Sequence, residues 1–251
     1  MLQLLQAAYD PTVSNGFYMG GSHMGYYVII LVVGVLGYIV QARLQSVFAK
    51  YAKEAIPNGM TGAEVAEKML RENRIYNVKI THVGGHLTDH FNPQNMTVNL
   101  SDSVYSSRSI SALAVACHEC GHAIQHARGY TPLVLRSQLV PLVSFASRAA
   151  QWVIIIGLIL LATTNSSIVA WIGIGLIGVS ALFSIVTLPV EYNASERALE
   201  WLESSRTLQG VQVDHARQAL RWAARTYLVA ALGAIASVLY YVMLVMGRRN
   251  D

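Results

Sequence analysis

Two histidines and a glutamate stand close together in the middle of the chain, in the stretch AVACHECGHAIQH (residues 114–126). His118, Glu119 and His122 form the pattern H-E-x-x-H. On an α-helix, positions i and i+4 share one face, so both imidazoles can reach one zinc ion, each at about 2.0–2.1 Å. Glu119 flanks that ion, where it can act as general base toward a metal-bound water. The spacing therefore predicts a catalytic zinc site.

A catalytic zinc requires a third protein ligand. His126 lies two helical turns from His118, roughly 12 Å along the axis, so a straight helix cannot place both on one ion. The two cysteines of the chain, Cys117 and Cys120, are interpreted as helix-packing residues, since position 120 points away from the face that carries His118 and His122. The third ligand is thus expected outside this helix.

Several residues remain as sources of that ligand. His90, in LTDHFNP, could line the cleft. Glu191 is expected to open a helix directly after the third apolar segment, where the helix dipole favours a carboxylate. Further glutamates follow on the same helix, namely Glu196, Glu200 and Glu203.

The composition predicts a membrane protein. The chain has 251 residues, of which 53% are hydrophobic and 13% charged, whereas soluble proteins carry about 25% charged residues. Transmembrane helices are expected at residues 24–41 and 227–247, with a transmembrane hairpin at residues 142–190. The lipid bilayer is therefore an expected partner. The formal net charge is +4, but no basic run interleaved with aromatic residues occurs, which argues against nucleic-acid binding.

The remaining segments are more polar. Residues 42–141 are predicted to form the first part of a catalytic domain and residues 191–226 the second part. Residues 1–23 are either a leader or a remnant of an expression vector, because GSHM (residues 21–24) resembles the scar of a cleaved tag. Residues 248–251 form a tail.

Within the first polar part the patterns indicate an α+β arrangement. Thr61 and Glu64 form a capping box before an amphipathic helix. NVKITHV (77–83) and NMTVNL (95–100) are predicted strands, and the zinc helix is expected to stop at Gly129. The second strand is predicted to form the edge of the cleft, where an extended peptide can add by backbone hydrogen bonds.

Basic residues predict the orientation in the membrane. Arg43, Lys50 and Lys53 follow the first apolar segment, which places its C-terminal end in the cytoplasm by the positive-inside rule. With four spans, both polar parts are then cytoplasmic and both termini lie outside. Arg248 and Arg249 would then lie outside, against the rule, but the basic residues of the two polar parts outnumber them.

Two motifs resemble a known group of enzymes. VACHECGHAIQH, followed after the hairpin by EYNASERA, resembles the integral-membrane gluzincins, which include the heat-shock membrane protease and the CAAX prenyl endopeptidase. In these enzymes the first glutamate of an E-x-x-x-D motif is the third zinc ligand, which implies Glu191 here. The aspartate position is Ser195, a departure from the pattern that weakens any inference about the role of that aspartate.

A finer resemblance is to the YugP-like neutral membrane zinc metallopeptidases. GGHLTDHFNP, VNLSDSVY and LPVEYNASERAL carry it, together with the zinc motif, over residues 25–247. The resemblance implies a mainly α-helical protein of the bacterial cell (inner) membrane, with about four transmembrane helices. It also implies a small α+β zincin-like catalytic domain at the cytoplasmic surface.

The interpretation that follows is a membrane-embedded zinc endopeptidase. His118, His122 and Glu191 are the predicted Zn²⁺ ligands, and Glu119 is the predicted catalytic base. The substrate is expected to be a peptide or protein, including membrane proteins. Two alternatives share the metal residues: a non-proteolytic membrane scaffold with structural zinc, and a zinc hydrolase of a lipid or a non-peptide amide. An intact Glu119 argues against the scaffold, because a structural site has no use for that base.

Overall fold

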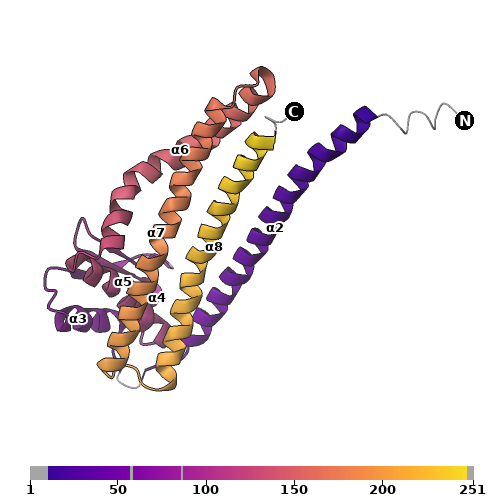
Figure 1. Ribbon diagram of the computed structural model, residues 1–251. Coiled ribbons are helices and arrows are strands. Elements are labelled where there is room, and N and C mark those ends of the chain that lie inside the picture. Colours follow the sequence, from indigo (N-terminus) through magenta and orange to yellow (C-terminus); the bar gives the residue numbers. More distant parts are fainter. Residues whose placement is uncertain (1–10, 57–58, 86, 248–251) are drawn as a thin grey trace, which may run out of the picture.

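Four long helices dominate the computed structural model, which describes residues 11–56, 59–85 and 87–247 (Figure 1). All four are long and apolar enough to cross a membrane. In α2 the candidate span covers Val28–Tyr51. Their bounds are α2 Pro11–Tyr51, α6 Thr131–Thr164, α7 Ile168–Ser204 and α8 Val211–Gly247. The predicted mainly helical fold, with four helices able to span a membrane by length and composition, is confirmed, although each helix continues beyond its apolar segment.

The predicted end segments are described only in part. Of residues 1–23, positions 1–10 lie outside the described residues, and the backbone from Pro11 onward is helical and continuous with the first span. The tail, residues 248–251, also lies outside them. The division of the chain into domains stays a prediction.

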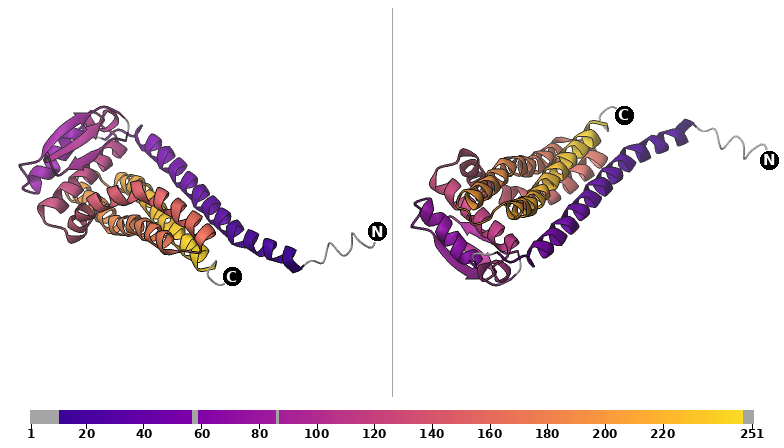
Figure 2. Two further views of the ribbon diagram at one scale, coloured as in Figure 1. Left: turned by 90° about the horizontal axis from the view of Figure 1, so that it is seen from above. Right: turned by 90° about the horizontal axis from the view of Figure 1, so that it is seen from below.

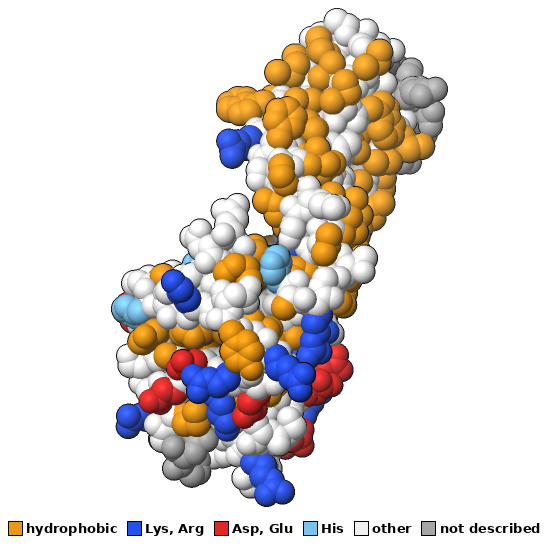
Figure 3. All heavy atoms as spheres, turned by 90° about the vertical axis from the view of Figure 1, so that its left-hand side faces the viewer, with side chains coloured by type: hydrophobic (Ala, Val, Ile, Leu, Met, Phe, Trp, Pro, Cys, Tyr) orange, Lys and Arg blue, Asp and Glu red, His pale blue; other side chains and the backbone are white. Residues whose placement is uncertain are grey.

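The long helices form an apolar column that stands on a charged base. Helices α6, α7 and α8 run side by side, whereas α2 diverges from them toward its N-terminal end (Figures 1 and 2). Hydrophobic side chains cover the upper part of the face in Figure 3, and charged side chains gather on the lower part. Such a boundary is expected where a protein leaves the hydrocarbon of a bilayer.

Small residues bring the hairpin helices together. A Cβ atom on Gly157 of α6 would lie 2.5 Å from Cα of Ala170 in α7. Such close backbone approach at small residues is typical of membrane helix pairs. Asn165, at φ +57°, ends α6 and begins the turn into α7. A short turn at residues 165–167 thus joins the two helices of the hairpin.

The base of the molecule combines helices with a small sheet. Its elements are α3 Gly62–Glu72, β1 Lys79–Val83, β2 His90–Asn92, β3 Thr97–Ser101, α4 Asp102–Tyr105 and α5 Ile110–Ala127. The predicted capping box is present: the Glu64 amide donates to Thr61 Oγ1 at 3.3 Å, and the Thr61 amide donates to Glu64 Oε2 at 2.7 Å. The predicted combination of helices and short strands is confirmed.

The strand order is β1-β3-β2, with β1 parallel and β2 antiparallel to β3. The prediction that residues 95–100 form the cleft edge is therefore wrong, because β3 is the central strand and Val98 is fully buried. The edge strand beside α5 is β2, which has only three residues and so shows no alternating pattern. A turn built on Asn92, whose Oδ1 accepts the amides of Gln94 and Asn95, brings the chain back along β3.

Candidate metal centre

Helix α5 carries the H-E-x-x-H motif and is buried on most sides. Its start is capped by Ser109 Oγ, which accepts the Ala112 amide at 3.3 Å. It ends in a Schellman motif: the Tyr130 amide donates to the Gln125 carbonyl, and Gly129 adopts φ +61°. The predicted stop at Gly129 is confirmed, and the motif lies on a rigid element.

Glu191 lies in the middle of α7, which runs without a break from Ile168 to Ser204. The prediction that Glu191 opens a helix is therefore wrong, and the dipole argument for it does not apply. Pro189 does not end the helix, since neighbouring groups can replace its lost hydrogen bond in a membrane helix. Packing, rather than a helix terminus, positions this carboxylate.

That packing depends on Gly121, which lies between the two histidines on α5. A Cβ atom at this position would lie 2.5 Å from the Ala194 carbonyl oxygen and 3.0 Å from its Cα, both backbone atoms of α7. Only glycine permits such a close approach. It brings Glu191 against the face of α5 that carries His118 and His122.

Gly121→Ala is expected to separate α5 from α7, because the helix backbone it meets cannot yield as a side chain can. We expect a fall of several degrees in Tm and a clear loss of bound zinc, measured by thermal unfolding in detergent and by elemental analysis. Gly175→Ala is the matched control on α7, since no atom of the described residues outside its own stretch of helix lies within 4 Å of a Cβ there. Equal behaviour of the two variants would contradict the packing role.

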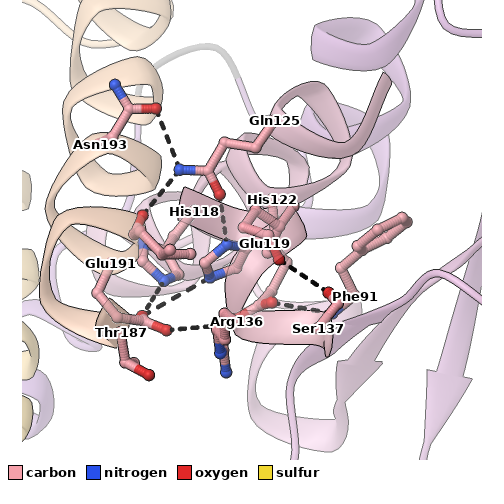
Figure 4. Close-up of polar contacts among 12 residues, drawn as sticks. Phe91, His118, Glu119, His122, Gln125, Arg136, Ser137, Thr187, Glu191 and Asn193 are labelled. Atoms are coloured by element: carbon pink, nitrogen blue, oxygen red, sulfur yellow. Dashed lines mark hydrogen bonds and ion pairs between the residues drawn. The ribbon is translucent and has the colours of Figure 1, made fainter. Parts of the chain in front are cut away.

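The three predicted ligands converge on one point (Figure 4). Glu191 Oε2 lies 3.3 Å from His118 Nε2 and 3.6 Å from His122 Nε2, and the ligand atoms of all three residues lie within 4.8 Å of one another. Ligands at about 2.0–2.1 Å from a tetrahedral zinc lie roughly 3.3–3.4 Å apart. Two imidazoles and one carboxylate are also the donor set of known catalytic zinc sites. The residues present therefore fit a zinc ion.

Buried hydrogen bonds orient both imidazoles. Gln125, fully buried, donates through Nε2 to the Val190 carbonyl at 2.8 Å and to Asn193 Oδ1 at 3.1 Å. Its Oε1 must then accept from His122 Nδ1, 3.0 Å away. Consequently His122 Nε2 presents its lone pair to the site. Sequence reasoning missed Gln125, although its place three residues after His122 puts it on the same helix face.

Ser195 supports the other histidine. Its Oγ lies 3.1 Å from His118 Nδ1, one turn of α7 beyond Glu191. It thus occupies the position of the aspartate in the E-x-x-x-D pattern and offers a neutral oxygen in place of a carboxylate. Although Ser195 departs from the pattern, it still provides His118 with a hydrogen-bonding partner.

The charge around the ligands favours a cation. Burial by itself lowers the pKa of His122, but Glu191, Glu119 and Gln125 raise it, and the resulting pKa lies above the usual value. The same negative charge attracts a divalent ion. Arg136 of α6 pairs with Glu191 Oε1 at 3.3 Å, which leaves Oε2 aimed at the histidines. Arg136 was missed because it lies on another helix, beyond the turn that ends α5.

Glu119 stands beside the three ligands and faces β2. The residue is 8% exposed, and its Oε2 accepts the Phe91 amide at 3.0 Å. A cleft of about 250 Å³ opens here, with Phe91 and His90 on one side and Arg136 and Tyr227 on the other. The free edge of β2 thus borders the cleft. On the face shown in Figure 3, the molecule is hollowed where its apolar and charged parts meet.

The other residues considered as metal ligands make different contacts. His90 lines the cleft but bonds the Thr88 carbonyl through Nδ1 at 2.8 Å. His126 packs against Phe91, with 5.7 Å between ring centroids. Cys120 donates to the Ala66 carbonyl at 3.5 Å, and burial raises the pKa of its thiol. The later glutamates line a separate groove between α7 and α8: Glu196, Glu200 and Glu203.

The chain is similar to known proteins over most of its length. The chain is 40% identical over 227 residues, 89% of its own length and 98% of the relative's, to a Bacillus subtilis (strain 168) protein named "Putative membrane protease YugP". No solved structure matches the present chain. A family model described as "Putative neutral zinc metallopeptidase" matches residues 26–246. The chain therefore belongs to this family of zinc metallopeptidases.

Proposed function

We propose that the protein is an integral-membrane zinc endopeptidase, with zinc held by His118, His122 and Glu191. The observation that carries the proposal is the convergence of these three ligand atoms within 4.8 Å, with Glu119 beside them and bordering a cleft. Family membership supports the reaction class. Cleavage of casein or of unfolded proteins by the wild type, lost in Glu119→Gln, tests the proposal. Bound zinc without any peptide cleavage would instead favour a scaffold or a hydrolase of lipids or other amides.

The proposed mechanism divides the work among the side chains. Zinc bound in such a site polarises a carbonyl and lowers the pKa of a water molecule. Glu119 removes a proton from the attacking water and passes it to the leaving amine. The Phe91 amide, 3.0 Å from Glu119 Oε2, orients the carboxylate. Gln125 and Ser195 hold the imidazoles so that each Nε2 faces the site.

We further propose that the substrate backbone lies along β2 rather than β3. Because β2 pairs with β3 on one side only, its other edge is available for an extended peptide. The Phe91 amide points to that edge and donates to Glu119 of α5, so an added peptide would pair there with the Phe91 carbonyl, which points to the same edge. The peptide would then pass directly over Glu119 and the three ligands.

Ser195→Ala is expected to weaken zinc binding by roughly 10–100-fold, the usual cost of losing a partner of a ligating histidine. Competition with a chelating dye measures this affinity. Ser195→Asp restores the carboxylate of the E-x-x-x-D pattern and is expected to bind zinc at least as tightly as the wild type. An unchanged affinity of Ser195→Ala would show that His118 needs no partner there.

We propose that residues 42–141 and 191–226 lie in the cytoplasm. Tyr76, 75% exposed, and Thr164, exposed at the end of α6, report on the two sides. A membrane-impermeant maleimide is expected to label Tyr76→Cys only in inside-out vesicles and Thr164→Cys only in intact spheroplasts. The native thiols, Cys117 and Cys120, are fully buried and give little background. The reverse pattern would invert the topology, and labelling of both from one side would contradict the hairpin.

A further inference from the structure

A second cavity reaches the predicted metal ligands beside the cleft. It has a volume of about 160 Å³ and shares five lining residues with the cleft, namely Asp89, His118, Glu119, Glu191 and Tyr227. The two cavities therefore meet at the ligand atoms. A substrate lying over the ligands could place one of its groups into this second cavity.

Most of the remaining lining of the second cavity is apolar and comes from three helices. Leu44 and Phe48 come from α2, Val115 from α5, and Ala223 and Ala224 from α8. Leu44 and Ala224 are buried, at 9% and 3% exposure. The alanines create the space, and Phe48 helps to close it. Apart from the residues shared with the cleft, which include Asp89, the lining carries no charged side chain, and such a wall favours an apolar ligand group.

The size of the cavity limits that group. An apolar cavity of roughly 150 Å³ holds one benzene ring, so the second cavity accepts one side chain of the size of leucine, methionine or phenylalanine. In an extended peptide, successive side chains point to opposite sides. Of the two residues that flank the cleaved bond, only one can therefore point into the second cavity.

We propose that the second cavity binds a large apolar side chain of the substrate at one of the two positions flanking the cleaved bond. The substrates are then peptide segments with leucine, methionine or phenylalanine at that position. The inference rests on the proposed peptidase activity. It also makes the first membrane helix, α2, part of the substrate site through Leu44 and Phe48, beyond its role as an anchor.

Two variants that change the cavity in opposite directions test this proposal. Ala223→Leu fills the cavity, and Phe48→Ala enlarges it. Matched controls are Ala230→Leu, at an exposed position two turns along α8, and Phe183→Ala, a half-buried position on α7; neither residue lines the cavity. The purified full-length proteins are incubated with a mixed peptide library, and the cleaved bonds are identified by mass spectrometry. Zinc content is measured in every sample.

We expect the wild type to prefer leucine, methionine or phenylalanine on one side of the bond. Ala223→Leu should lower kcat/KM for these residues relative to alanine by about tenfold or more, since each methylene in an apolar pocket changes specificity by roughly 10–200-fold. Phe48→Ala should move the preference on the same side toward tryptophan. The controls should keep the wild-type preference.

The outcomes separate the two proposals. Cleavage without a side-chain preference, or a preference that neither variant changes, overturns the role of the cavity and leaves the peptidase function intact. A change in both flanking positions also contradicts a single side-chain site. If the zinc-loaded wild type cleaves no peptide in the library, the peptidase function fails, and the cavity proposal fails with it.

Discussion

Glu119→Gln is expected to retain zinc and to lose peptide cleavage by about 10²–10⁴-fold, the usual contribution of a positioned general base. Glutamine has nearly the same shape, and its carbonyl oxygen can still accept the Phe91 amide that Glu119 Oε2 accepts at 3.0 Å. It cannot take a proton from water. The fold and the metal site should therefore survive while the chemical step fails. Turnover of a casein-derived fluorogenic peptide and zinc analysis of the same sample measure both properties.

The matched control for this variant is Glu203→Gln on α7, an exposed glutamate outside the cleft. It should keep wild-type turnover. Retained activity in Glu119→Gln would show that another group is the base, or that a contaminating protease causes the cleavage. Loss of zinc in Glu119→Gln would show instead that the carboxylate contributes to metal binding, which would change its assigned role.

Glu191→Ala is expected to abolish stable zinc binding. Zinc in a catalytic site has three protein ligands, and removal of one leaves only the two imidazoles of α5. The change also removes the partner of Arg136, which lies 3.3 Å from Glu191 Oε1. We expect zinc content to fall from about one ion per chain to near zero after dialysis, as measured by elemental analysis.

Glu196→Ala is the control for this second variant, since Glu196 lies on the same helix but lines the groove between α7 and α8. It should bind zinc as the wild type does. Zinc loss confined to Glu196→Ala would refute Glu191 as the third ligand. Removing zinc from the wild type with a chelator should lower its Tm, because a ligand that binds only the folded state stabilises it. Glu191→Ala should show no further decrease with chelator.

The features that neighbouring residues determine were predictable from the sequence. The four-residue spacing of His118 and His122 places both on one face of any α-helix. The Thr61–Glu64 capping box and the stop at Gly129 depend on contacts within one turn. The apolar segments predict membrane helices by their length alone. All of these appear in the structure because local geometry suffices to specify them.

Glu191 could be proposed from the sequence only through a resemblance of motifs. It is 73 residues from His118, and the sequence predicted a helix start where the structure has the middle of α7. What brings the carboxylate to the histidines is the backbone contact between Gly121 and Ala194. Neither residue by itself indicates its partner, because the contact depends on how α5 and α7 cross.

The sequence by itself thus determined that His118 and His122 share one face of α5, that Glu119 lies beside them, and that apolar helices long enough to span a membrane carry the chain. The tertiary structure decided the rest: the edge position of β2, the partners Gln125, Ser195 and Arg136, and the apolar cavity beside the ligands. Each of these requires side chains or strands from separate elements to meet. Their meeting depends on the packing of whole helices, whose crossing is set by many weak contacts rather than by any short motif.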